Sequence, residues 1–467
     1  MCLRYNSPLS MATFHILNFG CRASQADGAA LKQQLLAAGL QEAASVEQSA
    51  VAILNTCTVT AAADAEVRQF VRRIHRRNPH CRILVTGCYA QRAPEEIAGL
   101  EGVAWVVGNS HKHLVSAILA ESGDQEIGRS GSSRAPSPES PAPMVLVGEI
   151  SEEFHFAPVF ADDRTRPTLK IQDGCDARCS FCIIPAVRGP SRSLAPDEVV
   201  KQVRQLQAAG YLEVVLSGIN LGGYGRDLGR RINFLGMLER LLAETAIARL
   251  RISSIEPMDV SPALIRLVAR EPRMAQHFHV PLQSGCDRIL RRMNRRYWAR
   301  QYAERMLAIH EQIPNAALGA DVMVGFPGET AADHAASVRF IESLPYTYLH
   351  IFPFSARPGT PAANAPDQVN GRVARERSDE IRAVINAKRQ TYLATQVGRS
   401  LPALTLDETD EGARVALTTN YLKVALPNCD VRANRLVNAS VGRVTLGKLF
   451  GYMETEDRKQ KADGSKQ

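Results

Sequence analysis

The sequence of 467 residues lacks any apolar run close to the ~18 residues that a membrane-spanning helix requires. Its opening stretch, Met1–Ser10, also lacks the basic-then-apolar profile of a secretory signal peptide. These two absences argue against a membrane protein and a secreted protein, and they predict a cytosolic protein. Met11 directly precedes the first strand-like run and is a second candidate for the start of the chain.

A fourth cysteine is missing where three others gather. The stretch GCDARCSFC (residues 174–182) carries Cys175, Cys179 and Cys182 in a C-x₃-C-x₂-C spacing. A structural zinc site closes with four ligands, and an iron–sulfur cluster usually takes four thiolates. In a reducing compartment ten cysteines favour metal or redox chemistry over disulfides, so this spacing predicts a cluster with one iron left open. A zinc knuckle completed by a distant ligand is the alternative.

The chain is too long for one compact core, and two to four domains are expected. Short apolar runs alternate with helical patterns over residues 12–107, which predicts a small α/β domain with a parallel sheet. From Thr168 the alternation resumes as six βα units, which predict a partial (β/α)6 barrel with its site at the strand carboxyl ends. A doubly wound open sheet is the alternative. The predicted divisions are the small α/β domain over residues 11–120, a flexible linker rich in Ser, Pro and Gly over 121–143, the partial barrel over 160–396, and a small β-barrel over 397–455.

Three further cysteines share one structural position. Cys21 lies in NFGCRASQAD, Cys57 in NTCTVT and Cys88 in VTGCYAQR, and each follows a predicted N-terminal strand. They should therefore project from one sheet edge, where ligands of open α/β sheets bind. An ordinary buried cysteine is the alternative for each one, but their equivalent positions favour a second cluster with one open iron. Four cysteines match no ligand position: Cys2, Cys81, Cys286 and Cys429.

The C-x₃-C-x₂-C motif after the first barrel strand resembles that of the radical S-adenosylmethionine enzymes. The longer stretch LKIQDGCDARCSFCIIPAVRGPSRS, together with the dispersed triad, resembles the methylthiotransferases of that superfamily. The resemblance runs from Ala12 to Leu449, interrupted by the linker. It implies an α/β fold with a Rossmann-like N-terminal domain, a central TIM-type radical S-adenosylmethionine barrel and a C-terminal β-barrel of TRAM type.

The resemblance also implies the cofactors and partners. In the family a radical [4Fe-4S] cluster, here on Cys175, Cys179 and Cys182, cleaves S-adenosylmethionine to a carbon radical. An auxiliary [4Fe-4S] cluster, here on Cys21, Cys57 and Cys88, presents a sulfur that is methylated and transferred. The implied partners are tRNA and an electron donor of flavodoxin or ferredoxin type, and a monomer is expected.

Further residues fit supporting roles beside S-adenosylmethionine. The resemblance and the strand ends suggest the following contacts: Phe181, Gly218, Asn220, Glu256 and Gln283. The alternatives are a core aromatic for Phe181, a plain turn for the glycine-rich stretch 217–225, and surface loops for Glu256 and Gln283.

Members of the family modify either an adenosine beside the tRNA anticodon or an aspartate of a ribosomal protein. The adenosine enzymes act on an isopentenyl-adenosine or on threonylcarbamoyladenosine. The stretches GCRASQ, LKIQDGC and ARPGTPAA resemble the threonylcarbamoyladenosine branch most. Ser24 departs from the asparagine usual in the family, which puts hydrogen bonding near Cys21 in doubt. Arg188 is the candidate for recognising the threonylcarbamoyl carboxylate, the alternative being that it braces the cluster loop.

The charge pattern agrees with an RNA partner. The net charge is +8 and the pI is about 9.0. Two runs of arginines recur at helical spacing and predict contacts to phosphates, the alternative being solvated helix faces: Arg68, Arg72, Arg73, Arg76 and Arg77, then Arg288, Arg291, Arg292, Arg295, Arg296 and Arg300. The stretch TTNYLKV (residues 418–424) adds an aromatic and a lysine. A metal- or cluster-bearing RNA-binding protein without catalysis is the alternative from a different functional class.

Overall fold

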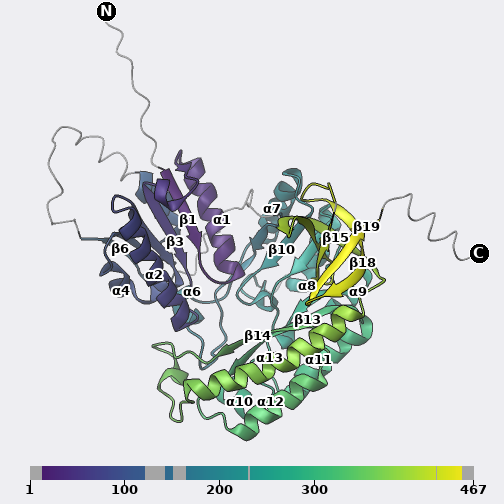
Figure 1. The fold of residues 1–467 in the computed structure, drawn as a ribbon. Helices are drawn as coiled ribbons and strands as arrows, with labels where there is room; N and C mark the ends of the chain where they lie inside the picture. The colour runs from purple at the N-terminus through teal and green to yellow at the C-terminus, as the bar shows by residue number, and fades with distance from the viewer. Residues whose placement is uncertain (1–12, 121–141, 151–164, 230–231, 428, 455–467) are drawn as a thin grey trace, which may run out of the picture. The chain divides into compact units, whose positions relative to one another are not determined.

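The computed structural model describes residues 13–120, 142–150, 165–229, 232–427 and 429–454 (Figure 1). The chain divides into two units. Unit 1 comprises Met1–Phe160 and Ile183–Pro190, and unit 2 comprises Ala161–Cys182 and Ser191–Gln467. Among the described residues, no helix is both long and apolar enough to cross a membrane. Apart from its last two residues, the linker predicted at 121–143 lies outside the described part of the chain.

Unit 1 is a parallel sheet in the order β2-β1-β3-β4-β5-β6, with apolar side chains packed on both faces. Its central strand β3, VAILNT, is buried at every residue, which explains the apolar run of its first four residues. The strands are β1 (Thr13–Asn18), β2 (Gln41–Glu42), β3 (Val51–Thr56), β4 (Arg82–Gly87), β5 (Val103–Gly108) and β6 (Met144–Leu146). The α-helices are α1 (Arg22–Ala37), α2 (Ala61–Arg77), α3 (Cys88–Arg92), α4 (Pro94–Ala98) and α6 (Ile184–Arg188).

Two segments of unit 1 lie outside the N-terminal domain predicted at residues 11–120. Strand β6 follows the predicted linker and pairs in parallel with β5. The segment Ile183–Pro190, which directly follows the C-x₃-C-x₂-C motif, also belongs to unit 1. Neither could be assigned from local sequence, because each joins the unit through contacts that are distant in the chain.

Unit 2 contains six parallel strands that neighbour one another in chain order. One sheet has the order β11-β10-β7 and a second has the order β12-β13-β14, and isolated parallel bridges connect β11 to the β12 region at Leu250–Met274 and Ser254–His279. This sequential order is that of the predicted partial (β/α)6 barrel. The strands are β7 (Thr168–Lys170), β10 (Glu213–Ser217), β11 (Arg249–Ile252), β12 (His277–His279), β13 (Ala317–Val324) and β14 (Tyr348–Pro353).

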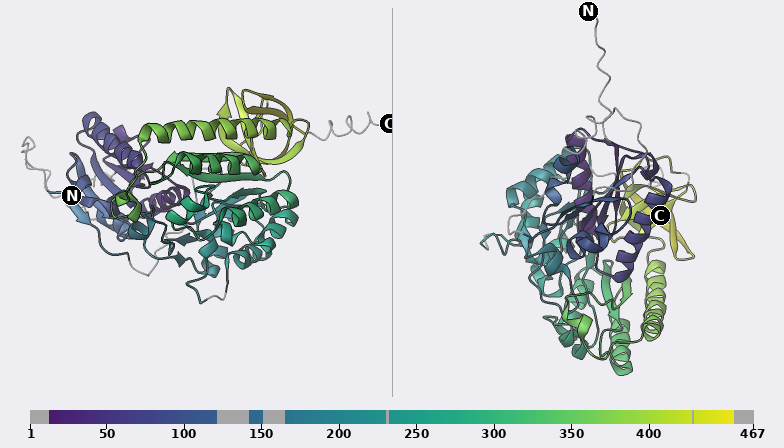
Figure 2. Two further views of the ribbon diagram at one scale, coloured as in Figure 1. Left: turned by 90° about the horizontal axis from the view of Figure 1, so that it is seen from below. Right: turned by 90° about the vertical axis from the view of Figure 1, so that its left-hand side faces the viewer.

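Helices cover the outside of this parallel arrangement. Their apolar faces pack with the strands in one continuous core. The long helix α13 runs beside α12 and leads into the C-terminal strands (Figure 2). These helices are α7 (Pro196–Ala208), α8 (Phe234–Glu244), α9 (Pro262–Arg270), α10 (Asp287–Arg292), α11 (Ala299–Gln312), α12 (Ala331–Ser343) and α13 (Gly371–Ala394).

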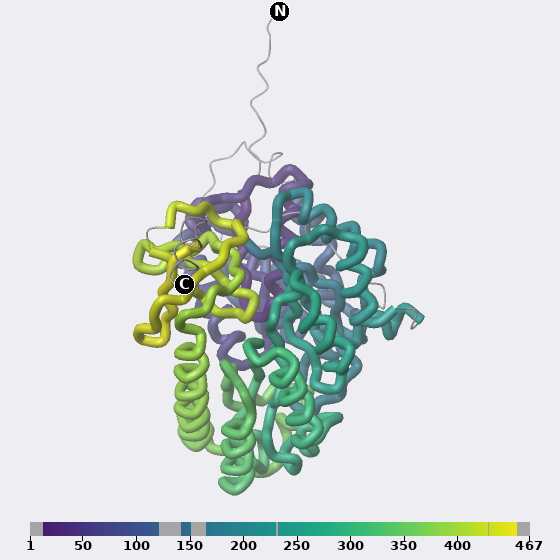
Figure 3. The backbone as a smooth tube through the Cα atoms, turned by 90° about the vertical axis from the view of Figure 1, so that its right-hand side faces the viewer, coloured from purple at the N-terminus to yellow at the C-terminus, as the bar shows by residue number. Residues whose placement is uncertain are grey.

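The C-terminal strands form the predicted small β-barrel, closed in the order β15-β16-β17-β19-β18 (Figure 3). The loop between β16 and β17 packs against the amino ends of the parallel strands of unit 2. There Arg251 donates to the carbonyls of Thr418 and Thr419 at 3.1 and 3.2 Å. The barrel strands are β15 (Ser400–Asp410), β16 (Ala413–Thr418), β17 (Lys423–Leu426), β18 (Leu436–Thr445) and β19 (Lys448–Met453).

This docking changes the role expected for Tyr421. The sequence stretch TTNYLKV suggested an aromatic side chain available to RNA. In the structure the Tyr421 ring stacks on His277, with ring centroids 4.2 Å apart. Its aromatic face therefore joins the C-terminal barrel to the parallel strands.

Candidate active site

Cys21, Cys57 and Cys88 lie at one edge of the unit 1 sheet. Cys57 and Cys88 directly follow β3 and β4, and Cys21 follows β1 after a two-residue turn. These three strands are adjacent and parallel, with Asn18 paired to Asn55 and Thr56 paired to Gly87. Parallel neighbours end at the same edge, so the topology brings together three thiols that are far apart in the sequence.

The backbone around this triad is tightly packed. Gly20 has a φ of +100°, and a Cβ atom there would lie 2.3 Å from the Cβ of Cys57. Only glycine allows the Cys21 turn to approach Cys57 so closely. Burial, followed by the neighbouring thiols of Cys21 and Cys88, raises the pKa of Cys57 to about 12. A bound cation would offset this cost of assembling three thiolates, so the triad has the chemistry of a metal-cluster site.

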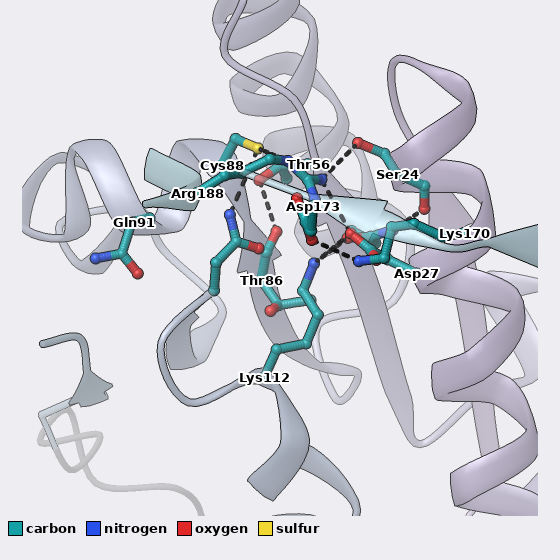
Figure 4. Close-up of polar contacts among 12 residues, drawn as sticks. Ser24, Asp27, Thr56, Thr86, Cys88, Gln91, Lys112, Lys170, Asp173 and Arg188 are labelled. Carbon is teal, nitrogen blue, oxygen red and sulfur yellow. Dashed lines mark hydrogen bonds and ion pairs between the residues drawn. The ribbon is translucent and has the colours of Figure 1, made fainter. Parts of the chain in front are cut away.

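Polar groups lie beside the cysteines of the triad, and Figure 4 shows those near Cys88. Asn109 Nδ2 lies 3.5 Å from the sulfur of Cys88. The hydroxyl of Ser24 lies 3.7 Å from the sulfur of Cys21, so the serine at this position still places a polar group beside the thiol. Arg188 is only 2% exposed and lies beside Cys88 and Asp27. This burial leaves it little surface for the substrate carboxylate that the sequence suggested as its ligand.

Cys175, Cys179 and Cys182 lie in a loop of unit 2 that follows β8 (Gln172–Asp173). At the base of the loop, β8 pairs with β9 (Arg192–Ser193), and Gln172 Nε2 donates to the carbonyl of Gly174 at 2.8 Å. The middle of the loop is held by the last residue of α10 and by the chain that follows this helix. Asn294 Nδ2 donates to the carbonyl of Arg178 at 2.6 Å, and Ser180 Oγ donates to that of Arg292 at 2.8 Å. These bonds order a loop that has little regular structure of its own.

Arg295 contacts the cysteine loop, a position that its place in the sequence did not predict. Its spacing in the sequence predicts a contact with RNA, but its side chain is only 6% exposed. It donates to the sulfur of Cys179 at 3.3 Å and forms an ion pair with Glu256. Burial raises the pKa of Glu256, and Arg295 opposes that effect. The pair therefore places a cation beside a cysteine of the C-x₃-C-x₂-C motif.

Three other arginines of the second run have different contacts. Arg288 pairs with Asp333, Arg291 lies over the Trp298 ring at 5.0 Å, and Arg300 pairs with Glu304. Arg291, Arg292 and Arg296 are exposed, so the structure withdraws Arg295 from the predicted cationic face and pairs Arg288 and Arg300 with carboxylates.

Several buried polar atoms at the carboxyl ends of the barrel strands have no hydrogen-bond partner among the described residues. They are Ser217 Oγ at the end of β10, Asn220 Oδ1 after it, Ser253 Oγ after β11 and Gln283 Oε1 after β12. Buried polar atoms without partners are costly, and a polar ligand bound at these strand ends would satisfy them. Gln283 also has a φ of 65°, a strained conformation of the kind found at ligand-binding sites.

The other residues suggested as cofactor contacts lie in this region as well. Phe181 packs edge-on against Phe326, with centroids 6.5 Å apart. A Cβ atom on Gly218 would lie 2.9 Å from Gln172 Oε1, the same oxygen that accepts from the backbone N–H of Asn220 at 2.7 Å. Gly218 thus permits the close packing that orders the loop after β10.

Strands β12, β13 and β14 bring together a polar cluster that the sequence did not predict, in which His279 is buried and His350 is exposed. Asp321 Oδ1 lies 3.1 Å from His279 Nε2 and 3.2 Å from His350 Nδ1. Burial favours protonation of Asp321, but the two histidines outweigh it and hold its pKa well below the usual range. The signal available was the alternation of polar and apolar residues along β12 (HFH) and at the start of β14 (YLH), together with Asp321 as the single polar residue of β13; such alternation is typical of side chains that point into a barrel.

Comparison with known proteins agrees with this assembly of sites. Residues 13–108 match the Uncharacterized protein family UPF0004, and residues 169–341 match the Radical SAM superfamily. The Threonylcarbamoyladenosine tRNA methylthiotransferase MtaB of Bacillus subtilis (strain 168) is 36% identical over 436 residues, which cover 92% of this chain and 94% of that protein. The chain belongs to the radical S-adenosylmethionine methylthiotransferase family.

The methylthiotransferase also resembles relatives with a different named substrate. The tRNA-2-methylthio-N(6)-dimethylallyladenosine synthase of Pelotomaculum thermopropionicum is 32% identical over 414 residues, covering 86% of this chain and 88% of that protein. Among solved structures, the radical S-adenosylmethionine methyltransferase TsrM from Kitasatospora setae has a TM-score of 0.52 at 16% identity. The match covers 76% of this chain and 77% of that one, and it shows a shared fold.

The family implies S-adenosylmethionine and a [4Fe-4S] cluster, and the residues of unit 2 fit both. The three cysteines of the ordered loop would hold the cluster, which leaves one iron free for the cofactor. The unpartnered oxygens of Ser217, Asn220, Ser253 and Gln283 would meet the polar groups of S-adenosylmethionine.

Proposed function

We propose that this methylthiotransferase carries two [4Fe-4S] clusters and converts N6-threonylcarbamoyladenosine, just 3′ of the tRNA anticodon, to its 2-methylthio derivative. The observation that carries the proposal is the second triad, Cys21, Cys57 and Cys88, assembled at adjacent strand ends of a unit separate from the C-x₃-C-x₂-C loop. The printed name of the Bacillus subtilis relative supports the choice of nucleoside. Carbon 2 of adenine is an unactivated C–H position, which suits radical chemistry.

The two clusters would receive different tasks from the residues around them. When bound, S-adenosylmethionine and the radical cluster supply hydrogen abstraction, and the auxiliary cluster supplies the sulfur. In unit 2, Arg295 would hold positive charge beside Cys179, and Asn220 and Gln283 would orient the cofactor. In unit 1, the edge formed by β1, β3 and β4 would hold the auxiliary cluster, with Asn109 donating toward Cys88. A flavodoxin- or ferredoxin-type protein would deliver the electrons.

Helix α2 provides a surface suited to the phosphates of tRNA. Arg72, Arg73 and Arg76 are exposed, and no carboxylate partner is found for them in the described part of the chain. By contrast, Arg68 pairs with Glu96 and Arg77 pairs with Glu47. The structure thus reduces the five arginines of the sequence run to three that are available for an anionic partner.

Replacing Arg72, Arg73 and Arg76 with alanine is expected to weaken tRNA binding and flatten its salt dependence. Each lost phosphate contact should lower the log–log slope by roughly one unit, because fewer counterions are released on binding. Fluorescence anisotropy at several salt concentrations measures the slope. Arg77→Ala is the matched control on the same helix, and it should have the smaller effect because Glu47 already neutralises that side chain. An unchanged slope in the triple variant would show that this face contacts solvent only.

Substrate choice tests the proposed function directly. Reconstituted enzyme, supplied with S-adenosylmethionine and reductant, should methylthiolate tRNA that carries threonylcarbamoyladenosine and leave tRNA that carries isopentenyl-adenosine unchanged. Mass spectrometry of the digested nucleosides detects each product. Activity on isopentenyl-adenosine, which the relative from Pelotomaculum thermopropionicum makes a reasonable second candidate, would reverse the assignment while retaining the cluster chemistry.

A further inference from the structure

Arg188 places a buried guanidinium group against Cys88, one cysteine of the auxiliary triad (Figure 4). Its Nε donates to the sulfur of Cys88 at 3.2 Å, and a terminal nitrogen donates to Asp27 at 2.9 Å and to the hydroxyl of Ser24 at 3.5 Å. The side chain is 2% exposed. A guanidinium is always charged at physiological pH, so this position brings a permanent cation to a ligand sulfur.

Packing and hydrogen bonds fix the position of Arg188 in unit 1. The preceding residue, Val187, packs with Ile183 and Cys88 in one apolar cluster. Asn109 Nδ2 donates to the carbonyl of Val187 at 2.8 Å and lies 3.5 Å from the Cys88 sulfur. The same side chain thus connects the backbone that carries Arg188 to the sulfur that Arg188 contacts.

Asp27 sets the orientation of the guanidinium. It is 8% exposed and accepts from both Arg188 and Lys112, at 2.9 and 3.2 Å. Lys112 also donates to Asn55 Oδ1 at 3.1 Å, and Asn55 Nδ2 donates to the carbonyl of Ser24 at 2.6 Å. These contacts point the Nε edge of Arg188 at Cys88. They come from α1, β3 and the chain after β5, so the arrangement depends on the whole sheet edge.

We propose that Arg188 is a positioning residue that sets the reduction potential of the auxiliary cluster. The inference rests on the proposed function, because it requires a cluster on Cys21, Cys57 and Cys88. Hydrogen bonds to ligand sulfurs, local charge and burial are the protein's main means of tuning such clusters. Reduction adds negative charge, and a buried cation beside a ligand sulfur stabilises the reduced form. Arg188 therefore makes the cluster easier to reduce than it would be with a neutral residue at this position.

The test uses the full chain with Cys175, Cys179 and Cys182 replaced by alanine, so that only the auxiliary site can hold iron. In this background, Arg188→Gln removes the charge and Arg188→Lys retains it without the planar fork. Arg82→Gln is the matched control. Arg82 begins β4, the strand whose other end leads into Cys88, and its guanidinium lies over the Trp105 ring at 3.9 Å. Anaerobic redox titration followed by electron paramagnetic resonance gives the midpoint potential, and iron analysis gives the occupancy.

We expect Arg188→Gln to lower the ratio of reduced to oxidised cluster about tenfold at a fixed solution potential, a shift of about 59 mV for a one-electron couple. Arg188→Lys should shift less in the same direction, and Arg82→Gln should not shift. Iron loss in Arg188→Gln that Arg188→Lys restores would also support the role of the cation. An unchanged midpoint potential in Arg188→Gln that holds its full iron would overturn the proposal. Iron loss from both Arg188 variants, with the iron of Arg82→Gln retained, would also overturn it. If the background itself held no iron, the auxiliary cluster of the proposed function would fail instead.

Discussion

Replacing Cys179 with alanine is expected to abolish S-adenosylmethionine cleavage, whereas replacing Cys57 should leave cleavage intact and stop methylthio transfer. The two residues lie in different units, and each is held by contacts within its own unit. Loss of one ligand from a three-cysteine site leaves an iron without its thiolate, so each variant should lose one cluster and retain the other.

The measurements are iron content, release of 5′-deoxyadenosine and formation of methylthiolated nucleoside. Cys81→Ala is the matched control, because Cys81 is a buried cysteine of unit 1 that precedes β4, at the end of the strand opposite Cys88. It should retain both clusters and both activities. Loss of cleavage in Cys57→Ala with its radical cluster intact would contradict the division of labour between the two triads.

Replacing Glu213 with glutamine is expected to destabilise unit 2 by about 3–5 kcal/mol, the usual cost of breaking a buried ion pair. Glu213 is fully buried at the start of β10 and accepts from Arg251 at 2.7 Å and from Arg166 at 3.2 Å. Glutamine at this position would leave the buried Arg251 without its carboxylate. Chemical denaturation measures the change. Glu198→Gln is the control. Glu198 forms an exposed pair with Lys201, so this substitution should change stability by about 1 kcal/mol or less.

The same residue predicts a pH dependence. Burial opposes ionisation of Glu213, but Arg251 and Arg166 outweigh it and hold the pKa at about 2. Because this pKa is below that of an unfolded glutamate, the stabilising contribution is complete above about pH 4.3 and is lost as the pH falls toward 2. Wild-type stability should therefore decline across this interval more steeply than that of Glu213→Gln. Equal slopes would show that Glu213 does not titrate in this manner.

The cysteine positions could be predicted because they depend on local features. Each N-terminal cysteine follows an apolar run, and parallel topology brings such strand ends to one edge. The order of the parallel strands in unit 2 was predictable for the same reason, since each βα unit is local in sequence.

The surroundings of the cysteines could not be predicted, because they depend on contacts between distant segments. Arg295 occurs in a stretch rich in basic residues, and nothing in its spacing separates it from exposed arginines. Arg188 follows the C-x₃-C-x₂-C motif, so its place in the sequence points to the substrate or to that loop and not to the other triad. Only the fold shows that Arg188 contacts Cys88, a hundred residues earlier, and that Arg295 contacts Cys179. Tyr421 likewise acquires its partner, His277, when the C-terminal barrel docks.

Mass spectrometry of tRNA nucleosides from a strain that lacks this gene tests the central claim most directly. The strain should accumulate N6-threonylcarbamoyladenosine and lack its 2-methylthio derivative, and the intact gene should restore the derivative while the Cys57→Ala and Cys179→Ala genes do not. A strain that retains the 2-methylthio derivative, or a Cys57→Ala gene that restores it, would contradict the account.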